Sequence, residues 1–427
     1  MKKTKEYIKS IVKSIVRLHP KGEYYARLLI FNMWRLKNLL VYHSIKIDVN
    51  RTYWISPQKI EYAFKGVNYQ KANYSKYGDR GTVQGGDWDL KRIKFSELPI
   101  YKAFVDHFAE KKDWEHTEFY RLILKEIQNG EAPWGCKTKS DVDKRFAQIG
   151  LLYEAIKRDG FKCQAELIRG HCPDGTPFQS EDEITLRIDR NGGILCEDGR
   201  HRLAIAKLLY MTEIPVKISV RHSRWYRFRK EILNYAKENK NRVYQRITHI
   251  DLSDIPSAHG DGRFKVMKPY LPVSKGDLLD IGAHWGYFSH KCEELEFNCH
   301  ALEFDHVNLY FLRKLKKAEN RKFEIIDKSV LDYRDKKYFS VVLALNIFHH
   351  LIKHEDSYYR LTEFLQNLNM NLMFFEPHLP DDPQMTGAFK NYNCDEFVEF
   401  VLKHTRLNHS KLIGEAEFNR PIYLLSE

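Results

Sequence analysis

The stretch LLDIGAHWGYFS at residues 278–289 decides the fold of the C-terminal part of this chain. It begins as an apolar strand that ends in Asp280, and a tight turn then leads into a helix. Gly282 and Gly286 have no Cβ atom, so the backbone in this turn can approach a ligand closely and adopt unusual dihedral angles. A dinucleotide-binding turn has the spacing GxGxxG, and this GxxxG turn lacks the middle glycine. The stretch therefore predicts a ligand-binding strand-turn-helix unit of another kind.

Strand-like and helix-like segments alternate on both sides of this turn. The expected strands are residues 278–282, 299–303, 323–326, 341–345, 372–376, 411–414 and 421–425. Helical spacing separates the first five of them, which is typical of βαβ units on a mostly parallel sheet, whereas the last two read as a closing strand pair. The expected fold of the C-terminal domain is thus α/β and Rossmann-like, with a mostly parallel seven-stranded sheet.

A second acidic position follows about twenty residues after the turn. The run ALEFD at residues 301–305 ends the second expected strand, which places Glu303 where a nucleoside-binding α/β fold holds the ribose hydroxyls. Asp305 is the nearby alternative.

Together these motifs resemble the class I S-adenosylmethionine-dependent methyltransferases, over residues 266–427. The family's first motif is an apolar strand followed by D/E-x-G-x-x-x-G, and it is matched here from residue 280 to 286. The run KSVLD at residues 328–332 is similar to the family's GDVLD pattern around the adenine, with Ser329 where an aspartate is usual. Asp327 or the backbone of Val330 is the alternative adenine contact. The run VVLALNIFHHL at residues 341–351 resembles the family's vlHHL segment, and the closing pair resembles its sixth and seventh strands.

The resemblance implies that this domain binds S-adenosylmethionine and transfers its methyl group. The cofactor-binding residues that it implies are Asp280, Gly282, Gly286, Glu303, Asp305, Ser329, Val330 and Asn346.

Histidines near the expected cofactor site suit proton removal from a hydroxyl acceptor, because the ordinary pKa of histidine is about 6.5. His349 and His350 follow the fourth strand, and Glu376 and His378 end the fifth, so we expect catalytic residues among these four. Two alternatives stay open: histidines that only pack under the cofactor loop, and a metal site that also uses His354. No carboxylate-rich ExxEHH stretch is present, which disfavours the metal site.

A second candidate site is the run EDGRHR, residues 197–202, between an expected strand and helix. Backbone N–H groups, the positive end of the helix dipole and guanidinium donors gather there, as in phosphate sites. With the IPV that follows at residues 214–216, the run resembles the ParB/sulfiredoxin-like fold over about residues 120–225. The expected phosphate-binding residues are Glu197, Asp198, Gly199, Arg200, His201 and Arg202.

This second resemblance implies an α+β middle domain that binds ATP or another nucleotide with magnesium. Arg200 stands where a sulfiredoxin has its catalytic cysteine, which argues against that activity. In a kinase, Glu197 or Asp198 would activate the acceptor hydroxyl. The alternative is an arginine cluster that only pairs with local carboxylates.

The distribution of charge divides the 427-residue chain into two parts, which indicates two units with different functions. Residues 1–265 contain 50 lysines and arginines against 33 acidic residues, and residues 266–427 contain 20 against 24. This disfavours a uniform nucleic-acid-binding surface. Seven cysteines without any CxxC spacing argue against a disulfide framework and a zinc ribbon, and favour a reducing, cytoplasmic setting.

Four segments are expected: a basic helical segment over residues 1–47, the middle domain over 48–235, a helix and linker over 236–265, and the methyltransferase-like domain over 266–427. The first segment has no secretory cleavage site. Its helical apolar spacing opposite lysines would suit contact with an anionic membrane surface, and packing on its own domain is the alternative.

The expected function is an S-adenosylmethionine-dependent O-methyltransferase that acts on a glycan or a lipid-linked saccharide, at the inner membrane surface if residues 1–47 bind it. The layout resembles that of methyltransferase-kinase enzymes that cap polysaccharide chains, although their kinase fold differs. The rival functions are a nucleic-acid methyltransferase with a ParB-like DNA- or RNA-binding domain and a nucleotide-binding scaffold without catalysis.

Overall fold

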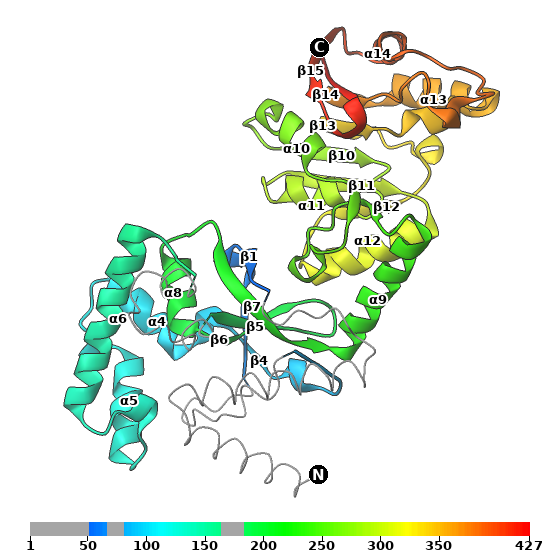
Figure 1. Ribbon diagram of the computed structural model, residues 1–427. Helices are drawn as coiled ribbons and strands as arrows, with labels where there is room; N and C mark the ends of the chain where they lie inside the picture. The colour runs from blue at the N-terminus through cyan, green and yellow to red at the C-terminus, as the bar shows by residue number, and fades with distance from the viewer. Residues whose placement is uncertain (1–50, 66–80, 164–182) are drawn as a thin grey trace, which may run out of the picture. The chain divides into compact units, whose positions relative to one another are not determined.

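A computed structural model describes residues 51–65, 81–163 and 183–427 of the chain (Figure 1). The chain divides into two compact units, Met1–Phe228 and Arg229–Glu427, and the boundary falls inside helix α9 (Ser223–Glu238). The basic segment expected over residues 1–47 lies outside the described residues. Within the described ranges, no helix combines the length and the apolar character needed to span a membrane.

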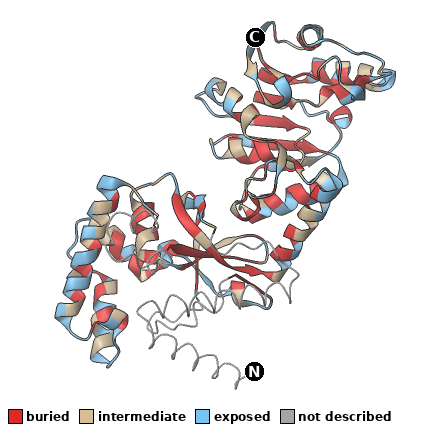
Figure 2. Ribbon diagram, in the orientation of Figure 1, coloured by how far each residue is buried: buried red, intermediate tan, exposed pale blue. Residues whose placement is uncertain are grey.

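The first unit contains a mixed seven-stranded sheet with the order β1-β7-β5-β6-β2-β4, and β3 also pairs with β7. Its strands are β1 (Tyr53–Ile55), β2 (Tyr62–Phe64), β3 (Thr82–Gln84), β4 (Arg92–Lys94), β5 (Ile184–Ile188), β6 (Ile194–Asp198) and β7 (Ile214–His222). Its other described helices are α4 (Pro99–Phe104), α5 (Glu118–Gln128), α6 (Lys139–Asp159) and α8 (Arg200–Leu208). All five residues of β5 are buried, as Figure 2 shows for the centre of this sheet. The unit is therefore α+β.

The strand pair before α8 positions the second candidate site. β5 and β6 pair in antiparallel register around a turn in which Asp189 accepts hydrogen bonds from the backbone of Asn191 and Gly193. Gly199 then adopts φ 81°, and a side chain there would meet Ile184, so only glycine fits between β6 and α8.

The second unit contains a seven-stranded sheet with the order β12-β11-β10-β13-β14-β16-β15. Its strands are β10 (Asp277–Ile281), β11 (Asn298–Glu303), β12 (Glu324–Asp327), β13 (Tyr338–Leu345), β14 (Asn369–Glu376), β15 (His409–Glu415) and β16 (Pro421–Ser426). The first five strands are parallel, and β16 pairs antiparallel with both β14 and β15. The register of β15 shifts at a bulge between Leu412 and Gly414. The Rossmann-like α/β fold expected for this domain is present.

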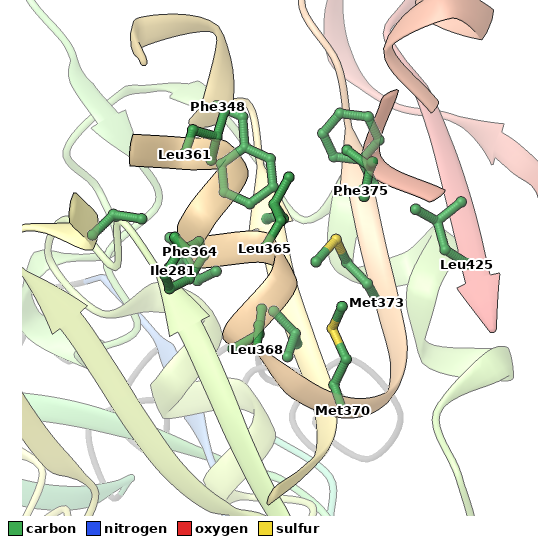
Figure 3. Close-up of a cluster of buried hydrophobic side chains, with 14 of the residues drawn as sticks. Ile281, Phe348, Leu361, Phe364, Leu365, Leu368, Met370, Met373, Phe375 and Leu425 are labelled. Atoms are coloured by element: carbon green, nitrogen blue, oxygen red, sulfur yellow. The ribbon is translucent and has the colours of Figure 1, made fainter. Parts of the chain in front are cut away.

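Successive residues of a strand point to opposite sides of the sheet, and here both sides carry apolar side chains. Helices therefore cover both faces. One face packs Leu278 against α10 (Gly262–Met267), α11 (Tyr287–Glu293) and α12 (His306–Ala318). The other face packs Leu279 and Ile281 against α13 (Glu355–Asn367) and α14 (Cys394–Lys403). Figure 3 shows Leu365 of α13 beside Met373 of β14, and Leu361 of α13 beside Phe348. These two cores fix the carboxyl ends of the parallel strands at one edge of the sheet.

Residues 236–265 were expected to be a helix and a linker, and the structure instead makes them an integral part of the second unit. They contain the parallel pair β8 (Val243–Gln245) and β9 (Ser257–His259), and buried Arg229 forms an ion pair with exposed Asp254. Glu417, just before β16, accepts hydrogen bonds from Gly260 N and Gly262 N, each at 3.0 Å. The linker was expected because the segment is polar and rich in turn residues, and this composition does not reveal contacts with distant parts of the chain.

Candidate functional site

The glycine turn lies at the carboxyl edge of the second sheet, between β10 and α11. Gly282 and Gly286 have φ angles of +68° and +82°, which favour glycine. A Cβ atom on Gly282 would lie 2.7 Å from Ile347, and one on Gly286 would collide with Leu312. Both glycines are therefore required by the unusual backbone conformation that the sequence predicted and, in addition, by close packing against Ile347 and Leu312.

Asp280 holds the helix behind this turn. Its Oδ2 atom accepts hydrogen bonds from Ser289 N at 3.1 Å and Ser289 Oγ at 2.7 Å. Burial raises the pKa of Asp280 to about 6, and the hydrogen bonds from Ser289 oppose that rise. The structure thus places this predicted cofactor residue in contact with α11.

Glu303 is buried at the end of β11, directly beside the turn. Its Oε2 atom accepts from His284 N at 2.8 Å, and its Oε1 atom accepts from Phe304 N and Asp305 N, both at 2.9 Å. Burial raises the pKa of Glu303, and the three N–H donors oppose that rise. A carboxylate has about four acceptor positions, so Glu303 can accept one further conventional hydrogen bond.

Asp305, the alternative to Glu303, has a different role. Its Oδ1 atom accepts from Asn308 N at 2.8 Å and caps the first turn of α12. Between these two acids, the ring of Phe304 is 61% exposed. An exposed aromatic ring next to Glu303 suits stacking with a flat nucleobase. The sequence analysis missed Phe304 because it considered only polar residues as candidates.

The residues after β12 serve mainly to cap a short 3-10 turn, Val330–Asp332. Ser329 Oγ accepts from Leu331 N at 3.2 Å, and the Val330 side chain is buried. Asp327 forms an exposed ion pair with Arg313 at 2.7 Å. The Ser329 side chain is thus used for this cap, and Asp327 and the Val330 backbone stay open as the predicted adenine contacts.

Three of the four predicted catalytic residues come together at the ends of β13 and β14. The rings of His349 and His378 are both buried, with centroids 5.9 Å apart, and exposed His350 lies 3.9 Å from His349. Burial, reinforced by the neighbouring His350 and His378, lowers the pKa of His349 to about 2. Burial also lowers the pKa of His378, whose Nε2 atom lies 2.8 Å from Asn391 Oδ1. Burial thus favours the neutral form of both imidazoles.

Glu376, the fourth candidate, is held in a buried ion pair. Arg263 Nε lies 2.7 Å from one carboxylate oxygen and Arg263 Nη2 lies 3.1 Å from the other. Both side chains are about 1% exposed, and Tyr244 OH lies 3.4 Å from the same guanidinium. This carboxylate is therefore committed to Arg263 and is not an open general base.

Several polar residues near this edge escaped the sequence analysis. Tyr244 is one of them: it packs against His259 and His284, and its OH lies 3.4 Å from Nδ2 of the predicted cofactor residue Asn346, which has a φ of 54°. We call the following residues the edge cluster: Tyr244, His259, Arg263, Asn346, His349, Glu376, His378, Glu417 and Arg420. Tyr244, His259 and Arg263 lie in the expected linker, and Glu417 and Arg420 lie between the last two strands. No motif spacing marks these five.

Buried polar atoms without a hydrogen-bond partner concentrate in and beside the edge cluster. Considering only residues that the structure describes, these atoms are His259 Nδ1, Arg263 Nε, His284 Nδ1, Asn346 Oδ1, His349 Nδ1, Glu376 Oε2, His378 Nδ1, Glu417 Oε2, Arg420 Nε and Arg420 Nη1, and Arg263 Nε and Glu376 Oε2 face each other in the ion pair. Leaving such a group unpaired costs about 1–3 kcal/mol, so a concentration of them indicates a ligand-binding region. Among the described residues, no group of three His, Cys, Asp or Glu side chains is arranged to hold a metal ion.

The acidic residues of the second candidate site lie at the junction of β6 and α8 in the first unit. Glu197 is buried, accepts from Arg187 Nε at 2.8 Å, and accepts from Ser219 Oγ through its other oxygen. Asp198 is exposed and accepts from Gly199 N at 2.9 Å. Of the two acids predicted to activate an acceptor, Glu197 is thus engaged internally.

The basic residues at this junction also contact their own domain. Arg200 is buried and donates to the Phe64 carbonyl at 2.7 Å, and burial lowers its pKa to about 10. The His201 ring packs between Phe104 and Trp134, and Arg202 lies 3.8 Å from Glu183. The six predicted residues are adjacent, but these contacts resemble the local network that the sequence left open as the alternative.

Comparison with known proteins gives likenesses at low identity. No protein-family model matches the sequence, and no curated protein matches it. Among solved structures, monomeric WbdD is 21% identical, with a TM-score of 0.38 over 45% of this chain and 48% of that chain. A second WbdD structure, described as a bifunctional kinase-methyltransferase, is 19% identical, with a TM-score of 0.37 over 45% and 46%. A SAM-dependent methyltransferase from Archaeoglobus fulgidus is 15% identical, with a TM-score of 0.30 over 39% of this chain and 94% of that chain. The matched region spans about half the length of WbdD.

Proposed function

We propose that the second unit binds S-adenosylmethionine and transfers its methyl group to an oxygen atom of an acceptor. One observation carries the proposal: Glu303 ends β11 beside the glycine turn and keeps one acceptor position for a ribose hydroxyl. The antiparallel closing pair of β15 and β16 agrees with the family resemblance that first suggested this activity.

The residues present fit such a cofactor. When bound, it supplies an electrophilic methyl group on a positively charged sulfur. In our proposal, the turn at residues 282–286 admits the cofactor against the backbone, Glu303 orients the ribose, and the ring of Phe304 covers the base. His349 and His378 orient the acceptor from the ends of β13 and β14.

Cofactor binding is tested by calorimetry on the full chain with S-adenosylmethionine and with its demethylated product. In Glu303→Gln we expect both affinities to fall at least about tenfold, because a charge-assisted hydrogen bond contributes about 1.5–3 kcal/mol. The matched control is Glu355→Gln at an exposed position of α13, which should bind as the wild type does. Absence of binding by the wild-type protein would refute the proposal, and binding without turnover would favour a non-catalytic scaffold.

For the acceptor, we propose a glycan or a lipid-linked saccharide at the cytoplasmic face of the inner membrane. Residues 1–265 have an excess of 17 positive charges, and residues 1–47 combine lysines with helical apolar spacing, which suits an anionic membrane surface. A nucleic-acid methyltransferase is the rival, because basic residues also bind phosphate backbones. Binding to DNA or RNA would weaken steeply with added salt, whereas binding to an uncharged glycan would not.

For the first unit, we propose that the start of α8 binds a nucleotide phosphate with magnesium, and that phosphorylation of the same acceptor is a second activity. Support comes from Arg202 in the first turn of α8 and from the exposed carboxylate of Asp198. We expect ATP, ADP or CTP to raise the thermal midpoint of the wild type but not that of Arg202→Ala. Exposed Arg224→Ala is the matched control. If a nucleotide raises the thermal midpoint of Arg202→Ala as much as that of the wild type, the arginines have only a structural role.

A further inference from the structure

We infer that Phe418 is a specificity-determining residue of this domain, and that its ring stacks against the apolar face of a sugar whose hydroxyls reach Glu417 and Arg420. The inference rests on the proposed methyl transfer to a saccharide, and it names the surface that recognises the sugar ring.

Phe418 lies in the turn between the last two strands, at the same edge of the sheet as the predicted catalytic residues. β16 starts at Pro421 and runs antiparallel to β14, with Tyr423 opposite Phe375. The turn before β16 therefore lies past the end of β14, beside the edge cluster. The ring of Phe418 contacts His259 of that cluster in a T-shaped arrangement, with the two ring centroids 5.2 Å apart.

The backbone of this turn does not favour phenylalanine. Phe418 and Asn419 have φ angles of +66° and +56°, and a hydrogen bond of 3.0 Å from Ala416 N to Arg420 O closes the turn. Two successive left-handed residues are typical of a tight hairpin turn, in which asparagine and glycine are the favoured residues. Asn419 fits this preference, whereas the bulky side chain of Phe418 is strained there. Residues strained in this way cluster at functional sites, where the side chain has a use that outweighs its cost.

Packing within the domain does not account for the ring. The side chain of Phe418 is on the surface, with the residue 56% exposed. The T-shaped contact with His259 covers only part of the ring. The faces of an aromatic ring are electron-rich and attract the C–H groups that line the apolar side of a sugar. The exposed ring therefore suits stacking with a saccharide.

Buried polar atoms with opposite hydrogen-bonding roles flank Phe418 in the chain. Glu417 Oε2 is an acceptor, Arg420 Nε and Nη1 are donors, and none of these atoms has a hydrogen-bond partner among the residues that the structure describes. Glu417 Oε1 accepts from Gly260 N and Gly262 N, each at 3.0 Å, which fixes the orientation of the carboxylate. Burial opposes the ionisation of Glu417, but these backbone hydrogen bonds outweigh it and lower its pKa. The carboxylate therefore acts only as an acceptor.

A ligand with hydroxyl groups satisfies both kinds of atom, because each hydroxyl can donate and accept. A sugar carries several hydroxyls around its rim and C–H groups on its face, so it can stack on Phe418 and reach the polar atoms on either side. A ligand that only accepts hydrogen bonds has no donor for Glu417. Within the domain, His259 Nδ1 lies 4.0 Å from Glu417 Oε2, which is too far for a hydrogen bond.

The binding test uses saturation-transfer NMR titrations of the full chain without cofactor. The probes are the methyl glycosides of glucose, galactose, mannose, rhamnose and N-acetylglucosamine, with uridine added as a probe for stacking of a nucleobase. The wild type should bind at least one glycoside, and Phe418→Asn should bind it about two- to tenfold more weakly. Absence of binding to all five glycosides, equal affinity in Phe418→Asn, or binding of uridine alone overturns the inference.

Two further variants test the ring and the hydroxyl contact. Phe418→Tyr keeps the aromatic ring and should bind the glycoside as the wild type does. Glu417→Gln replaces the unpaired acceptor by a donor and should bind it about tenfold more weakly, and unchanged affinity overturns the contact with Glu417. Tyr338→Asn is the matched control, because Tyr338 is 53% exposed at the start of β13, at the opposite edge of the sheet.

Thermal unfolding separates binding from packing. Asparagine adopts the left-handed conformation more readily than phenylalanine, so Phe418→Asn should unfold at a midpoint no lower than that of the wild type. A midpoint lower by more than about 2 °C would show that the ring is retained for packing on His259, and it would overturn the inference.

The two proposals fail separately. Calorimetry with the demethylated cofactor product should give the wild-type affinity in Phe418→Asn, so a loss of glycoside binding then belongs to the acceptor side of the site. Absence of that cofactor binding in the wild type refutes the methyltransferase proposal, while the NMR titration still decides whether Phe418 binds a sugar.

Discussion

Substituting Arg263 by methionine should destabilise the second unit strongly, because the change leaves the charge of Glu376 buried without its partner. The ion pair has contacts of 2.7 and 3.1 Å, and both side chains are about 1% exposed. Removing one member of a buried pair of this kind costs about 3–5 kcal/mol. Part of the cost is relieved when Glu376 takes up a proton, since its burial already raises the pKa and the loss of Arg263 removes an opposing effect.

Amide hydrogen exchange measured by mass spectrometry on the full chain can isolate this effect to the second unit. Peptides that cover β14 should exchange about 100 to 3,000 times faster in Arg263→Met, since each 1.4 kcal/mol is about a factor of ten. The double variant Arg263→Met/Glu376→Leu should recover most of the protection, because no unpaired charge remains. Arg406→Met controls for loss of an exposed arginine and should change exchange little.

Either of two results would refute this reasoning. Protection of β14 that changes by less than about threefold in Arg263→Met would show that the ion pair contributes under 1 kcal/mol. The second result concerns the double variant. If its loss of protection equals the sum of the losses in the two single variants, the two residues act independently.

Two further predictions concern residues of the glycine turn. Burial raises the pKa of Asp280 to about 6, above its value in the unfolded chain, so protonation stabilises the folded unit as the pH falls from 7 through 6 towards 4. Relative to Asp280→Asn, the wild-type unit should gain about 2–3 kcal/mol over this interval in urea titrations, and parallel curves would contradict the assignment. Gly286→Ala should cost about 2–4 kcal/mol in the same titrations, since it adds a collision with Leu312 to the strain of a positive φ. Gly387→Ala has a similar φ of +76° but open space around its Cβ, so it should cost only about 1 kcal/mol, and equal costs would show that packing against Leu312 is unimportant.

The parallel part of the second sheet was predictable from sequence because each of its strands is a short apolar run that ends in a turn or a charged residue. Gly282, Gly286 and Glu303 were predictable for the same local reason, since a tight turn and a strand end each demand particular residue types. Local spacing also located the β5–β6 pair and the start of α8.

Five members of the edge cluster could not be predicted, because they reach it only when β16 pairs with β14 and when residues 243–263 pack onto the second unit; these are Tyr244, His259, Arg263, Glu417 and Arg420. Arg263 precedes Glu376 by more than a hundred residues, and nothing in either local sequence indicates the other. The place of residues 236–265 in the second compact unit could not be predicted for the same reason, since they have the polar composition of a linker. The contacts of Glu197 and Arg200 likewise depend on β7 and β2, which lie far from them in sequence.

The bulge in β15 has a consequence for the behaviour of the protein at high concentration. β15 is the last strand of its sheet, and most of its residues are exposed, including Leu412 at 53%. A regular exposed edge strand offers a row of N–H and C=O groups to which another copy of the chain can add a strand, and this is a common start of aggregation. The bulge between Leu412 and Gly414 interrupts that row. The irregularity thereby protects the unit from self-association, and straightening it would lower the solubility of the protein even where the fold itself is unchanged.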